Sequence, residues 1–82
     1  MRDEILVLRA RREEAKRELE RLEIVAARLV ADVRLVLDPY ADSVTELDLR
    51  RGRELFEELY RHWQEARRLK EKISRITEDL GE

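Results

Sequence analysis

The stretch LVLDPYADSVTELD, residues 35–48, decides the fold of this 82-residue chain because it holds the only proline and separates two long apolar repeats. The ring of Pro39 disfavours helical backbone at Asp38, so a helix arriving from the N-terminal side is predicted to end just before that aspartate. Further along, Ser43 and Glu46 have the spacing of a capping box, in which a hydroxyl and a carboxylate bind the first backbone amides of a helix. The segment therefore predicts a break between two helices.

Apolar residues on both sides of this segment recur in alternating steps of three and four, the repeat that keeps one side of a helix against a partner. The repeat before the break, called the first seam, consists of Ile5, Leu8, Arg12, Ala15, Leu19, Leu22, Ala26, Leu29, Val33 and Val36. The repeat after the break, called the second seam, consists of Gly52, Leu55, Leu59, His62, Ala66, Leu69, Ile73, Ile76 and Leu80. We expect one all-α domain over 1–82, an antiparallel two-helix coiled-coil hairpin with helices at 3–37 and 47–80 and a loop at 38–46.

Composition narrows the classes of function that the chain can have. Charged residues make up 46% of it, yet the net charge is only −2, whereas dedicated nucleic-acid binders usually carry a clear basic excess. The sequence has no cysteine and one histidine, which argues against disulfides and structural zinc, and we expect no cofactor. The apolar runs are too short to cross a bilayer, so we expect a soluble, cytoplasmic protein without membrane contact.

Apolar residues outside the seams are concentrated near the loop, and a helix that is apolar over more than one stripe is buried on more than one side. One hairpin cannot bury them all, so we expect a homodimer in which two hairpins form a four-helix bundle. The expected interface residues are Val25, Val30, Leu37, Phe56 and Trp63. The alternatives are that both aromatic side chains fold over their own hairpin, or that a different protein covers them.

Three seam positions depart from the apolar pattern. His62 is expected to be a neutral core histidine that fixes the helix register, with a pH-sensitive interface or a shared metal site as alternatives. Arg12 is expected to lay its stem along the seam and send its charged head to solvent. Gly52 either permits close helix approach near Leu29 or Val33, or it marks a break after a first short turn.

Arg50, Arg51 and Arg53 form the densest basic cluster of the chain and are candidate nucleic-acid contacts. Arginine side chains in such a stripe can bind phosphates. Glutamates are interspersed along the same helix and weaken the positive field, so a solvated face is the simpler interpretation. A small nucleic-acid-associated regulator is therefore the second hypothesis for function.

The predicted loop is acidic, and Asp38, Tyr40 and Asp42 are candidate contacts at its tip. The Asp38–Pro39 pair with Asp42 resembles the tip of the coiled-coil hairpin factors that enter the secondary channel of bacterial RNA polymerase. The resemblance implies, as a third hypothesis, a hairpin whose acidic tip acts on a larger enzyme. It covers only the tip, since the zinc-binding cysteines and globular second domain of that family have no counterpart in this sequence.

Two further resemblances concern the second helix and the overall shape. Residues 47–54, LDLRRGRE, are similar to the second-helix segment of all-helical chorismate mutases, which hold a dicarboxylate with arginines from several helices. The predicted architecture resembles the small plasmid RNA-modulating hairpin dimer, which binds RNA on a bundle face. Neither resemblance supplies a catalytic motif, and a slender hairpin has no concavity of its own, so we expect a non-enzymatic oligomerisation or adaptor module.

Overall fold

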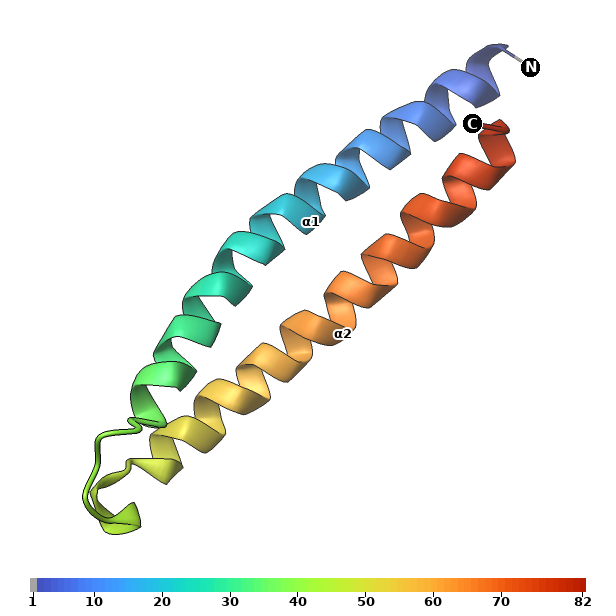
Figure 1. Ribbon diagram of the computed structural model, residues 1–82. Coiled ribbons are helices and arrows are strands. Elements are labelled where there is room, and N and C mark those ends of the chain that lie inside the picture. Colours follow the sequence, from blue (N-terminus) through green and yellow to red (C-terminus); the bar gives the residue numbers. More distant parts are fainter. Residues whose placement is uncertain (1) are drawn as a thin grey trace.

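The computed structural model describes residues 2–82 and confirms an all-helical hairpin (Figure 1). Helix α1 spans Arg2–Val36, the short 3-10 helix η1 spans Val44–Glu46, and helix α2 spans Leu49–Leu80. The two long helices run antiparallel and pack against each other, with no strand in the described part of the chain. The result is a thin rod of 64 × 17 × 15 Å.

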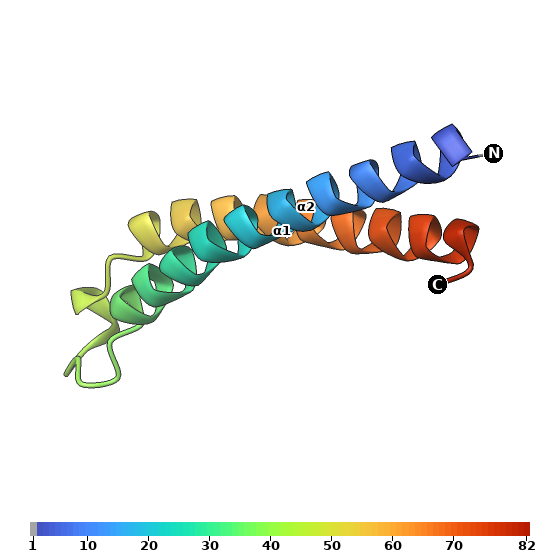
Figure 2. The same cartoon turned by 90° about the horizontal axis from the view of Figure 1, so that it is seen from above.

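The core of the rod is a single line of seam residues between the helices. The buried side chains all belong to the two seams, and they are Ala15, Leu29, Leu55, Leu69 and Ile76. The helices cross near their middles, as the view from above shows (Figure 2). Two helices can bury only one stripe each, so most of the remaining side chains are at least partly open to solvent.

The loop is held by short-range hydrogen bonds that follow from its residue types. The Asp38 carboxylate accepts a hydrogen bond from the Tyr40 amide at 3.0 Å, the local turn that aspartate favours. The Ser43 hydroxyl caps η1 by accepting from the Thr45 amide, and the Glu46 carboxylate reaches back to the Asp42 amide at 3.0 Å. The capping-box residues thus organise a short 3-10 turn rather than the start of the long second helix.

Helix α2 begins at Leu49, two residues after the expected start, because Asp48 caps it. The Asp48 carboxylate accepts a hydrogen bond from the Arg51 amide at 3.1 Å. At the other end, Gly81 adopts a left-handed conformation with φ of 70°, which terminates the helix. Both ends of α2 are therefore defined by the residue types that stand there.

Gly52 is a point of close contact between the helices, inside α2 rather than at a break. A Cβ atom at this position would lie 2.8 Å from Cγ1 of Val36, far inside normal contact distance. The close approach that the sequence suggested near Leu29 or Val33 thus occurs at Val36, one turn closer to the loop than Val33. Glycine avoids this contact at the point where α2 passes close to Val36.

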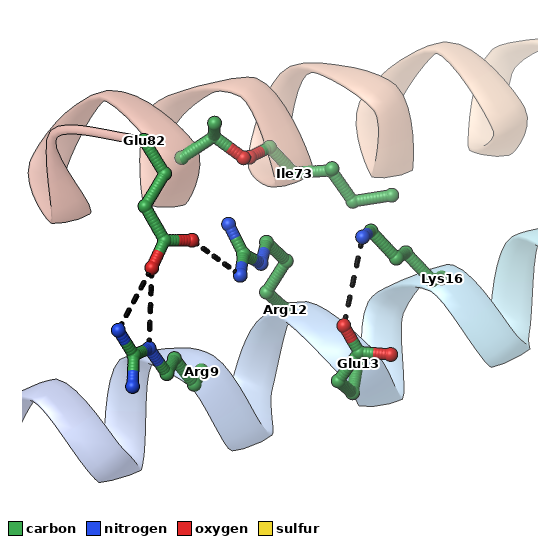
Figure 3. Close-up of polar contacts among 7 residues, drawn as sticks. Arg9, Arg12, Glu13, Lys16, Ile73 and Glu82 are labelled. Atoms are coloured by element: carbon green, nitrogen blue, oxygen red, sulfur yellow. Dashed lines mark hydrogen bonds and ion pairs between the residues drawn. The ribbon is translucent and has the colours of Figure 1, made fainter.

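At the end of the hairpin opposite the loop, ion pairs link α1 to the residue that follows Gly81 (Figure 3). The Arg12 side chain is only 14% exposed and its guanidinium forms an ion pair with the Glu82 carboxylate at 2.6 Å. Arg9 donates to the same carboxylate through Nε at 3.2 Å and Nη2 at 3.0 Å. The expectation that the head of Arg12 points to solvent is therefore wrong, because the residue after Gly81 folds back over α1 and binds it.

Candidate docking face

The most prominent surface feature is a row of large apolar side chains along one side of α2. Leu49, Phe56 and Trp63 are spaced seven residues apart and therefore point the same way, and Tyr60 lies between the last two. These four side chains are each between 49% and 60% exposed. Neither aromatic side chain of the predicted interface is covered by its own hairpin.

Helix α1 extends this row across the hairpin. Leu37 is 56% exposed and lines an open groove together with Val33, Val36, Leu49, Gly52, Arg53, Phe56 and Glu57. Val30 is half-buried and stands one heptad before Leu37 on the same side of α1. We call the surface formed by Val30, Leu37, Leu49, Phe56, Tyr60 and Trp63 the aromatic face.

The rings of the aromatic face are ordered by contacts with one another and with arginine. The centroids of the Tyr60 and Trp63 rings are 5.5 Å apart with a 30° tilt. The guanidinium of Arg67 lies over the Trp63 ring, 5.0 Å from its centroid, in a cation–π contact. Arg53 is held by the Glu57 carboxylate at 3.3 Å. The contacts of Tyr60 and Trp63 restrict these two rings before any partner binds, which lowers the entropy that binding would lose.

Val25, the fifth predicted interface residue, lies on a different side of the hairpin. Val30 follows it by five residues, a rotation of roughly 140° around an ideal helix. Val25 is 46% exposed and lines another hollow, with Glu18, Arg21, Leu22, His62, Glu65 and Leu69. The structure therefore brings together Val30, Leu37, Phe56 and Trp63, and it separates Val25 from them.

His62 lines this second hollow and makes a hydrogen bond within its own helix. Its Nδ1 atom is 2.8 Å from the backbone carbonyl oxygen of Glu58. Since a carbonyl can only accept, Nδ1 carries a proton and donates. In the neutral ring Nε2 is then the acceptor, and it is the nitrogen left for any other contact.

An ion pair between Glu65 and Arg68 borders this hollow, and Glu65 is the member that lines it. The Arg68 guanidinium donates to the Glu65 carboxylate through Nε at 3.0 Å. This hydrogen bond lowers the pKa of the Glu65 carboxyl and raises that of Arg68. The pair lies on the surface, so it contributes little to folding but fixes the rim of the hollow.

At the tip, the predicted contact residues are partly used by the loop itself. The Asp38 carboxylate accepts from the Tyr40 amide, and the Asp42 amide donates to Glu46. The Tyr40 ring is among the most exposed apolar groups of the chain. The tip therefore offers one open aromatic ring beside carboxylates that organise the turn.

The basic cluster at the start of α2 is largely paired within its own helix. Arg51 lies 3.7 Å from the Glu54 carboxylate and Arg53 lies 3.3 Å from that of Glu57. Arg50 is exposed. Two of the three candidate phosphate-binding side chains thus already have glutamate partners one turn further on.

The structure also shows an apolar surface near the start of α1 that the sequence analysis did not predict. Ile5, Leu6 and Val7 are between 44% and 59% exposed near the N-terminal end of α1. Consecutive apolar residues point around a helix at about 100° intervals, so they cannot all face one seam. The run Ile5-Leu6-Val7-Leu8 itself was the signal for this second apolar surface.

No protein-family model, curated protein or solved structure matches this chain. Within residues 2–82, no group of three or more histidine, cysteine, aspartate or glutamate side chains could hold a metal ion. Neither long helix, over the described residues, has the length and apolar character needed to cross a membrane. The geometry of the chain's own surface is therefore what points to a function.

Proposed function

We propose that this chain is a non-enzymatic self-association module. Two hairpins pair through their aromatic faces, pack as a coiled-coil-like four-helix bundle, and present the outer surface of that bundle to another macromolecule. The single observation that carries the proposal is the exposure of Leu37, Phe56 and Trp63 on one continuous face.

The size of the exposed surface supports a partner of this kind. Three aromatic side chains about half exposed present roughly 300 Å² of apolar area, as large as the biggest patch on a typical monomer. Two copies would bury roughly twice that area through the rings alone. Val30, Leu37, Leu49 and the arginine stems bring the total toward the roughly 1,000 Å² expected of a specific interface.

The test is the oligomeric state as a function of concentration. Sedimentation velocity of the purified chain should show a dimer at micromolar concentration, and Phe56→Ala combined with Trp63→Ala should give a monomer. Leu35→Ala is the matched control, because Leu35 is 78% exposed but lies roughly 160° around α1 from Leu37. A wild-type chain that stays monomeric up to about 100 μM would refute the proposal, because the affinity of the dimer would then be far lower than that of specific protein interfaces.

The two other hypotheses have weaker support. A nucleic-acid surface would use Arg50, Arg51 and Arg53, and two of these are ion-paired with glutamates. Phosphate binding would have to displace those carboxylates. A gel-shift assay at low salt tests this function directly, and binding there that disappears with Arg50→Ala would favour it over self-association alone. The acidic tip has no further observation in its favour.

A further inference from the structure

The aromatic face has opposite charges at its two ends. Beyond Leu49 lies the acidic loop, whose exposed carboxylates include those of Asp42, Glu46 and Asp48. Beyond Trp63 on the same side of α2 lie Arg67 and Lys70, both exposed. Neither of these cations has an ion-pair partner among residues 2–82. The face is therefore apolar in the middle, negative toward the loop and positive toward the chain ends.

Two identical faces can stack around a two-fold axis in two ways. If the axis runs along the rod, both loops lie at the same end and α2 of one copy covers α1 of the other. If the axis runs across the rod, the loops lie at opposite ends and α2 covers α2 of the second copy. The charges at the ends of the face distinguish these arrangements.

The arrangement with both loops at one end brings like charges together. It gathers Asp42, Glu46 and Asp48 of two copies around one end of the bundle, where Arg53, the cation of the groove at that end, is already paired with Glu57. The crossed arrangement does the opposite, because each acidic loop then extends along the basic end of the other face. Charge complementarity of this kind sets the orientation of a complex more than it sets its affinity.

We infer that the aromatic face binds a second copy of this chain in antiparallel orientation, with each acidic loop lying on Arg67 and Lys70 of the other copy. This inference rests on the proposed self-association and adds its geometry. Phe56 is midway between Leu49 and Trp63, so an axis at Phe56 gives the largest overlap of the two apolar rows. Leu49 then packs on Trp63 of the second copy.

The same axis also places the charged residues in register. The acidic loop, which precedes Leu49, comes beside the residues that follow Trp63 in the second copy, among them Arg67 and Lys70. Arg53 comes beside Tyr60 of the second copy, repeating between chains the cation–π contact that Arg67 makes with Trp63 within one chain. Arg53, Tyr60 and Arg67 alternate along α2. In an antiparallel pair, the arginines of one copy therefore lie beside the aromatic rings of the other.

A distance measurement between the two loops tests the orientation. Val44 is exposed and its side chain makes no hydrogen bond, so Val44→Cys carrying a spin label should leave the fold intact. In the antiparallel dimer the two labels should be roughly 35 Å apart: about 10 Å of helical rise separates Phe56 from Leu49 in each copy, and the loop beyond Leu49 supplies the rest. With both loops at one end they would lie within about 20 Å, roughly two helix diameters.

The outcomes separate the inference from the function on which it rests. Sedimentation on the same labelled sample reports whether a dimer forms at all. A dimer with a short label distance overturns the antiparallel inference and leaves self-association standing. A monomer, with no dipolar coupling between labels, overturns both.

Charge reversal provides a second, independent test. Arg67→Glu with Lys70→Glu should weaken the dimer by roughly tenfold or more at low salt, and Asp42→Lys with Glu46→Lys should do the same. Combining all four changes should restore most of the affinity, because opposite charges face each other again. Lys72→Glu with Arg75→Glu is the control, because it changes the charge of α2 by the same amount at positions that lie outside the aromatic face. Failure of the combined variant to recover would overturn the inference.

Discussion

Replacing Gly52 by alanine should destabilise the hairpin, although alanine is the better helix former. The propensity gain inside α2 is about 1 kcal/mol. The new methyl carbon would lie 2.8 Å from Cγ1 of Val36, about 1 Å inside a comfortable carbon–carbon contact. Val36 is β-branched and cannot rotate away freely in a helix, so the overpacking should cost about 1–3 kcal/mol. We expect a net loss of about 1 kcal/mol, equivalent to a fall in Tm of roughly 4–8 °C.

The decisive assay is a double-mutant cycle measured by thermal and urea unfolding at one fixed protein concentration. In a Val36→Ala background the crowded methyl groups are gone, so Gly52→Ala should now stabilise by about 1 kcal/mol. In a Val33→Ala background it should still destabilise, because Val33 lines the same groove but does not crowd Gly52. A Gly52→Ala chain more stable than wild type, or a sign that does not reverse with Val36→Ala, would refute the close-contact argument.

Three further predictions concern the aromatic face and the C-terminal end of α2. Trp63→Ala should raise the dimer dissociation constant by roughly 30-fold or more, the loss of an interface anchor, as measured by light scattering over a dilution series. Gly81→Ala should lower stability by about 1 kcal/mol in urea unfolding, since its φ of 70° is unfavourable for any residue with a Cβ. Glu82→Gln should increase the mobility of residues 78–82 in NMR relaxation. Hydrogen bonds from Arg12, and then Arg9, hold the pKa of the Glu82 carboxyl below its ordinary 4.5. Its contribution is therefore fully present above that pH and disappears as the pH falls through the lowered pKa. If wild-type residues 78–82 are equally mobile at pH 7 and pH 3, the ion pair has no role in closing that end.

The sequence allowed the hairpin to be predicted because its decisive signals are local. Alternating steps of three and four fix one side of each helix, and Asp38 before Pro39 fixes where the first helix stops. The start of α2 was less predictable, because Ser43 and Asp48 are both good capping residues. Which of them starts the long helix depends on how the loop spans the gap between two packed helices.

The candidate site was only partly predictable, for a geometric reason. Val25 and Val30 are both apolar residues outside the first seam, so both were predicted to be interface residues. Their angular positions around α1 place Val30 on the aromatic face and Val25 in the hollow beside His62. The ion pair between Arg12 and Glu82 joins residues at opposite ends of the chain, and no repeat within either helix could reveal it. Leu6 and Val7 are exposed apolar residues that the sequence also contains. The heptad repeat assigns only their neighbours Ile5 and Leu8 to the first seam, so it predicts nothing about Leu6 and Val7.

The start of α1 and the end of α2 lie side by side, while the loop lies at the far end of the rod (Figure 1). A hairpin with this layout can be spliced into a surface turn of an unrelated host protein, because entry and exit points are already adjacent. It would then act as a rigid spacer that holds a peptide inserted in place of residues 39–47 away from the host surface. Its reach of 64 Å would exceed the diameter of many small globular domains.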